Sequence, residues 1–65
     1  MSKLQNARKA AGLSQSKLAS TSGVNVRMIQ HYEQGVKDIN QAAAITLYQL
    51  AKSLNVSIED LLEIE

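Results

Sequence analysis

Hydrophobic side chains recur every three or four residues along most of the chain, which is the period of an amphipathic α-helix. The clearest example is an apolar stripe in the second half, formed by Ala44, Leu47, Leu50, Ala51 and Leu54. No stretch shows the alternation with a period of two that β-strands require. The glycines stand about one short helix apart, where helices are expected to end, at Gly12, Gly23 and Gly35. The pattern predicts an all-α fold.

Helix-capping signals divide this pattern into five predicted helices. The first four cover about residues 2–11, 15–20, 26–34 and 41–54, and a short fifth helix starts after Ser57. N-cap candidates stand before four of the five, at Ser14, Asn25, Asn40 and Ser57. Ser57 and Asp60 also have the spacing of a capping box, and Asn55 suits the left-handed position after a helix.

Size and composition narrow the class of protein. The 65 residues form one domain, over 1–65, which is small for a stable core. Aromatic residues make up 3% of the sequence, so the core must be aliphatic. The sequence has no cysteine, no apolar run as long as a membrane span and no signal-peptide core, so the expected location is the cytoplasm.

Residues 14–35 have the format of a helix-turn-helix, two short helices joined by a turn at Gly23. On a helical wheel, Ile29, Tyr32 and Glu33 share one side of the second helix. The other side carries long polar groups of the kind that read base edges in the major groove of DNA, namely Arg27, Gln30, His31 and Gln34. An ordinary solvated helix face is the alternative interpretation.

Charge is distributed unevenly, although the net charge is only +1. Residues 1–37 hold six lysines and arginines against one carboxylate, whereas residues 38–65 hold one lysine against five carboxylates. The positive part would turn the two-helix motif toward a phosphate backbone, with chance segregation as the alternative. Gln15 and Lys17 begin the first motif helix, where free N–H groups favour a phosphate, but idle surface positions explain them equally well.

Two charged residues fall on apolar helix faces. Arg8 shares a face with Leu4 and Ala7, and Glu33 lies beside Ile29. Each charge is costly to bury alone, but an arginine and a carboxylate satisfy each other through two parallel hydrogen bonds. We expect Arg8 and Glu33 to form a structural ion pair between the first and third helices.

The fifth predicted helix carries more apolar side chains than one face can bury. Ile58, Leu62 and Ile64 therefore form a candidate self-association patch. A homodimer formed there would present two recognition helices about one DNA turn, roughly 34 Å, apart. A fraying terminus is the alternative.

These residues resemble the Cro and phage-repressor type of helix-turn-helix, also called the xenobiotic-response-element family. The resemblance covers nearly the whole chain and rests on Arg8, Gly12 to Gln15, Leu18-Ala19, Gly23-Val24, Ile29, Tyr32-Glu33, Gly35, Leu50-Ala51, Leu54 to Ser57 and Leu61-Leu62. It implies a compact five-helix, lambda-repressor-like domain that binds double-stranded DNA sequence-specifically and regulates transcription.

The resemblance also implies which residues touch DNA. Base contacts are expected from Val26, Arg27, Met28 and His31. Contacts to the DNA backbone are expected from Ser14, Gln15, Asn25, Lys37 and Asn40. Lys17 is added to this set because it lies near the start of the first motif helix. Val26 and Met28 are apolar where polar residues are usual, so they either meet a thymine methyl or read no sequence.

An enzyme is not expected. The lone histidine, His31, has no cysteine or carboxylate pair beside it in the pattern, so we predict no catalytic residue, metal or cofactor. His31 is either a contact whose charge responds to pH or an ordinary surface residue. The rival function is an antitoxin-like module whose C-terminal helix binds another protein, and a piece of a longer regulator is a further alternative.

Overall fold

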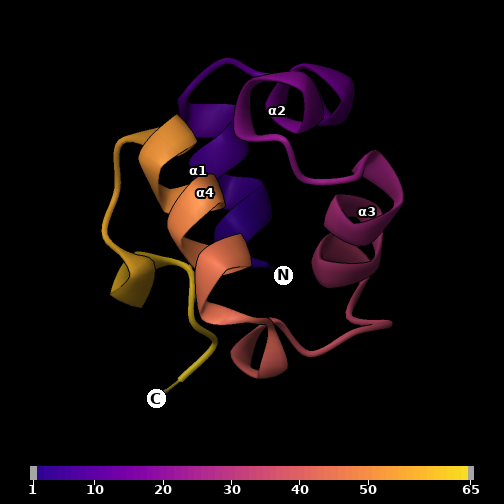
Figure 1. The fold of residues 1–65 in the computed structure, drawn as a ribbon, viewed down its shortest axis with the longest axis vertical. Coiled ribbons are helices and arrows are strands. Elements are labelled where there is room, and N and C mark those ends of the chain that lie inside the picture. The colour runs from indigo at the N-terminus through magenta and orange to yellow at the C-terminus, as the bar shows by residue number, and fades with distance from the viewer. Residues whose placement is uncertain (1, 65) are drawn as a thin grey trace.

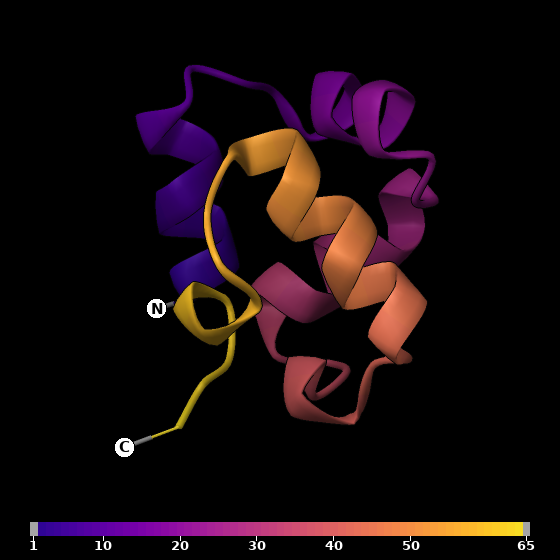
Figure 2. The same ribbon diagram turned by 60° about the vertical axis from the view of Figure 1, so that its left-hand side comes forward.

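The computed structural model describes residues 2–64, and within them the chain forms four α-helices. These are α1 (Lys3–Ala10), α2 (Gln15–Ser22), α3 (Val26–Gln34) and α4 (Ala44–Leu54), with two single 3-10 turns, η1 (Ile39–Gln41) and η2 (Ile58–Asp60). This part of the chain contains no strand, which confirms the all-α prediction. α2 packs against α3 and α4, and α1 packs against α3, so the helices enclose one core (Figures 1 and 2). No helix within residues 2–64 is both long and apolar enough to cross a membrane.

The core is aliphatic, as the composition predicts. Its largest fully buried side chains are Leu4, Leu18, Ile29, Leu50 and Leu61. Each of the four helices and the segment after η2 supplies one of them. Every element therefore depends on the others for the burial of its apolar side.

Most of the expected helix ends are present. Ser14 Oγ accepts a hydrogen bond from the Lys17 N–H at 3.0 Å and so caps α2. Gly23 ends α2 and Gly35 ends α3, with φ angles of 77° and 78° that a side chain rarely tolerates. Asn55 ends α4 with a φ of 57°, as predicted for a short polar side chain at this position.

The prediction that Asn40 caps a helix starting near residue 41 is wrong. Asp38 caps η1 instead, because its Oδ1 accepts from the Asn40 N–H at 2.9 Å. This turn carries Ile39 into the core, where it is 3% exposed, and the chain is extended before α4 begins at Ala44. Ala44 is consequently exposed, and the buried part of the predicted apolar stripe starts at Leu47.

The predicted fifth helix is also wrong, because the segment after Ser57 forms only the turn η2. Its capping box is present: Ser57 Oγ accepts from the Asp60 N–H at 3.2 Å, and the Asp60 carboxylate accepts from the Ser57 N–H at 3.1 Å. Leu61 then enters the core. Beyond it, the Glu63 N–H donates to Asn40 Oδ1 at 2.8 Å, and Asn40 Nδ2 donates to the Glu63 carbonyl at 3.2 Å. These bonds hold the chain on a path that a helix would not follow.

Leu61→Ala is expected to lower the free energy of unfolding by about 2–5 kcal/mol, because it leaves a cavity at a fully enclosed site. Ile64→Ala is the matched control, since Ile64 is 57% exposed, and it should change stability by less than about 0.5 kcal/mol. Urea denaturation followed by circular dichroism measures both. Equal effects would contradict the packing of the C-terminal segment described here.

Candidate nucleic-acid interface

α2 and α3 are joined by a short turn over residues 23–25 that fixes the direction of α3. Val24 is 7% exposed and fills the space beneath the turn, while its N–H donates to Ser22 Oγ at 3.1 Å. Asn25 Oδ1 accepts from the Arg27 N–H at 2.7 Å and begins α3. The turn thus has a buried apolar side chain, and the N–H groups of Gly23 and Val24 both have acceptors, as a rigid connection requires.

α3 has one face in the core and the other toward solvent, as the helical wheel predicts. Ile29 is fully buried and Tyr32 is 8% exposed. On the opposite face Arg27 and Gln34 are exposed, and Gln30 and His31 are half-buried. The exposed face thus carries one guanidinium and several amide or imidazole groups over two turns of helix.

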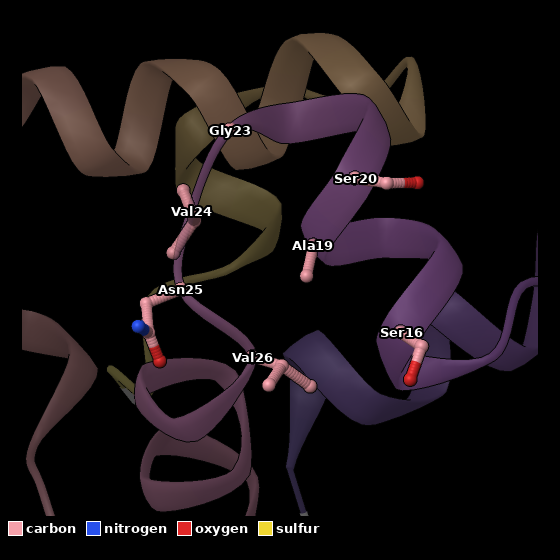
Figure 3. A pocket seen from close by; sticks show the side chains of 7 residues that line it. All are labelled: Ser16, Ala19, Ser20, Gly23, Val24, Asn25 and Val26. Carbon is pink, nitrogen blue, oxygen red and sulfur yellow. The ribbon is translucent and has the colours of Figure 1, made fainter.

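Three of the predicted base-contact residues are less exposed than Arg27. Val26 is half-buried and lines a cleft of about 620 Å³ between α2 and the start of α3 (Figure 3). Met28 packs partly against the core. The Nδ1 of His31 is buried and has no hydrogen-bond partner among residues 2–64, so His31 does not stand fully in solvent as the wheel suggests.

A buried ion pair holds α3 from its inner side. The Arg8 Nε donates to Glu33 Oε2 at 2.7 Å, and Arg8 Nη2 donates to Glu33 Oε1 at 3.0 Å. Two further bonds surround the pair: Arg8 Nη1 donates to the Leu13 carbonyl at 2.8 Å, and Gln15 Nε2 donates to Glu33 Oε1 at 3.0 Å. The two charged side chains are 10% and 2% exposed. The ion pair expected from the two helix wheels is thus present, and it joins α1, the start of α2 and the end of α3.

The pair shifts the pKa of both of its members. Burial disfavours charge on Glu33, but the hydrogen bonds from Arg8 and Gln15 outweigh it, so the pKa of Glu33 lies below its ordinary value. The hydrogen bond to Glu33 raises the pKa of Arg8. The folded protein therefore favours the charged form of each residue.

Exposed cations lie before, on and after α3. Arg8 and Glu33 form the one ion pair within the part of the chain that the structure describes, so Lys17, Arg27 and Lys37 stand exposed without a carboxylate partner there. Lys17 lies in α2, Arg27 at the start of α3 and Lys37 just after its end. Each of these three side chains offers an unpaired positive charge to a polyanion at the solvent-exposed surface.

A family model described as helix-turn-helix matches residues 4–61. The chain belongs to the Cro/C1-type helix-turn-helix family. The resemblance inferred from sequence is thereby confirmed. No curated protein and no solved structure matches the chain significantly.

Four side chains predicted to contact phosphate already make hydrogen bonds inside this helix-turn-helix domain. Ser14 and Asn25 accept as N-caps, so their hydroxyl and amide hydrogens remain able to donate. Gln15 gives one amide hydrogen to Glu33 and keeps the second. Asn40 is bonded at both ends of its amide to the Glu63 backbone, which gives it a place in the fold.

The start of α4 is a further feature of this surface that sequence reasoning missed. No side chain caps α4 at Ala43, so its first N–H groups carry the partial positive charge of an open helix N-terminus. Ala43, Met28 and Lys37 line one cavity of about 390 Å³, which places this helix start beside α3. Because Asn40 has a good capping side chain, the sequence predicts a capped helix start there instead of an uncapped start at Ala43.

The predicted self-association patch is only partly exposed. Ile58 and Leu62 pack in part against the domain's own core, whereas Ile64 is 57% exposed. Between them, the Glu63 carboxylate accepts from the Lys3 N–H at 2.6 Å and ties the segment to the start of α1.

A double-mutant cycle tests the ion pair. Arg8→Ala alone is expected to destabilise the fold by about 3–5 kcal/mol, because it leaves the Glu33 carboxylate buried without its partner. In a protein that already carries Arg8→Ala, Glu33→Ala should lower the free energy of unfolding by much less than it does in the wild type. The difference is the coupling energy, which we expect to be at least about 1 kcal/mol. Strictly additive losses in urea denaturation would contradict the pair.

Stability should also fall in acid through Glu33. Because its pKa is lowered by folding, its contribution is complete above the ordinary value of 4.5 and is lost as the pH falls through the lower folded value. Glu33→Gln keeps the shape and removes the titrating group, so the variant should lose less stability than the wild type between neutral pH and acid. Parallel stability curves for the two proteins would contradict the assignment.

Proposed function

We propose that this domain binds double-stranded DNA sequence-specifically and regulates transcription, with α3 in the major groove. The observation that carries the proposal is the exposed Arg27 guanidinium on the face opposite Ile29 and Tyr32. Arginine paired with O6 and N7 of guanine is the commonest specific contact in that groove. Since Glu33 already holds α3 from inside, little reorganisation would be needed on binding.

Contacts to the DNA backbone would come from the groups around α3. Lys17 and Lys37 are exposed cations, and the second amide hydrogen of Gln15 lies in the first turn of α2. The open N-terminus of α4 adds a further group of suitable charge. Such contacts position the protein and make its affinity depend on salt, but they carry no sequence information directly.

We further propose that two copies bind an inverted repeat. The exposed Ile64 supports self-association through the C-terminal segment, with Ile58 and Leu62 adding the parts of their surfaces that the core leaves uncovered. The two α3 helices would then enter successive major grooves, roughly 34 Å apart.

The alternative function, an antitoxin-like module that binds a partner protein through a C-terminal helix, has weaker support, because the segment after Ser57 forms only the turn η2. Leu61 is fully buried in the domain's own core, and Glu63 is bonded to Asn40. The surface that this segment leaves exposed, chiefly Ile64, is the surface proposed above for a second copy of this chain.

Arg27→Ala is expected to weaken binding to the preferred site by about 1–3 kcal/mol and to relax the preference at one base. Lys37→Ala should instead weaken binding to all sequences alike and reduce the salt slope by about one. Sites selected from a random pool of duplexes, followed by titrations at several salt concentrations, measure both effects.

Lys52→Ala is the matched control for this pair of variants. Lys52 is exposed but lies on α4 over the ring of Tyr48, with Nζ at 5.7 Å from the ring centre, so its removal should leave binding nearly unchanged. Equal losses for Arg27→Ala on selected and random duplexes would contradict the base-reading role of Arg27.

A further inference from the structure

We propose that Asn40 is a positioning residue for DNA binding, because its side chain ties the loop between α3 and α4 to the C-terminal segment at Glu63. The proposal rests on the function proposed above, in which Lys37 and the start of α4 meet the DNA backbone. It gives Asn40 an indirect role in place of the phosphate contact expected from the sequence. The C-terminal segment then determines how well this side of the DNA-binding surface is arranged before a duplex arrives.

The loop over residues 36–43 carries two of the groups proposed to meet the DNA backbone. Lys37 stands exposed near its beginning, and α4 starts at its end without a side-chain cap at Ala43. Both residues line the cavity of about 390 Å³ beside α3. Between them, Ile39 is buried and anchors the turn η1 in the core. The positions of Lys37 and of the α4 start therefore depend on how firmly this loop is held.

Most hydrogen bonds of the loop reach only its neighbours in sequence. The Val36 and Lys37 N–H groups donate to the His31 carbonyl of α3 at 2.9 and 3.2 Å. Apart from the bonds of Asn40, no hydrogen bond within residues 2–64 joins this loop to a part of the chain far away in sequence. One side chain therefore makes the polar tie between the loop and a distant part of the domain.

The amide of Asn40 binds both polar backbone groups of a single residue. Its Oδ1 accepts from the Glu63 N–H at 2.8 Å, and its Nδ2 donates to the Glu63 carbonyl at 3.2 Å. Glu63 is itself held in place, because Leu61 just before it is fully buried and its own carboxylate accepts from the Lys3 N–H at 2.6 Å. Asn40 thus ties the loop to a fixed point at the start of α1.

A loop held in this way needs less ordering when it binds, and a smaller ordering cost means a higher affinity. The rival role for Asn40 is a direct bond to phosphate, since one hydrogen of Nδ2 is left after the bond to Glu63. The two roles make different demands on Glu63. Positioning requires the Glu63 N–H and carbonyl, whereas a direct phosphate bond does not.

A cycle of four proteins separates the two roles: the wild type, Asn40→Ala, Glu63→Pro and the protein with both changes. Proline removes the N–H that Asn40 binds and leaves Ile64 in place. We expect each single change to weaken binding to a selected duplex about two- to tenfold, the range for one hydrogen bond. The double variant should bind no more weakly than the weaker single variant. Circular dichroism checks that all four proteins are folded.

Glu63→Ala is the matched control, because it removes the carboxylate and keeps both backbone groups, and it should bind DNA nearly as the wild type does. In free protein, Asn40→Ala and Glu63→Pro should both shift the backbone amide signals of Lys37 and Ala43, whereas Glu63→Ala should not. If Glu63→Pro does not fold, a chain that ends at Leu62 takes its place in the cycle. Its reference is then Ile64→Ala, which also lacks the exposed apolar side chain.

The outcomes separate this inference from the proposed function. Losses that multiply in the double variant would assign Asn40 to a contact of its own with DNA and overturn the inference. Wild-type affinity in Asn40→Ala, or equal affinities of Glu63→Pro and Glu63→Ala, would also overturn it. In each of these cases the duplex is still bound, so the DNA-binding proposal stands. Failure of the wild type to bind any duplex would overturn both.

Discussion

The orientation of α3 depends on one buried ion pair. Arg8 and Glu33 meet through two parallel hydrogen bonds, and their remaining polar atoms bind the Leu13 carbonyl and the Gln15 amide. α1, the loop after it, the start of α2 and the end of α3 therefore share one set of bonds. Loss of either charge would leave the other unpaired in the interior, and this makes the arrangement of these parts nearly all-or-none.

The same bonds reach the surface that is proposed to meet DNA. Gln15 uses one amide hydrogen on Glu33 and keeps the other at the start of α2, where an anion would be attracted. Because Arg8 neutralises Glu33, the carboxylate does not oppose a phosphate near Gln15. One buried contact thus connects α3 with α1 and α2 and leaves the acidic residue of α3 neutralised.

Much of this architecture is accessible from the sequence. The periodicity of Ile29 and Tyr32 predicts the inner face of α3, and two charges on apolar faces predict the Arg8–Glu33 pair because each needs a partner. Capping residues predict a helix start wrongly where a distant part of the chain binds the capping side chain. Asn40 has a good capping side chain, but Glu63, 23 residues away, takes its amide, and α4 begins later than predicted. The half-burial of His31 likewise comes from tertiary packing, which one helix wheel does not contain.

The central claim is that the outer face of α3, held in place from within, is the surface that binds DNA. Backbone ¹H–¹⁵N spectra of the folded domain, recorded during titration with a selected duplex in dilute salt, test it most directly. The account predicts the largest changes at α3, Lys37 and the start of α2, while the exposed Tyr48 and Lys52, further along α4, stay unchanged. No change at any duplex concentration, or changes centred on α4 and the C-terminal segment, would contradict it.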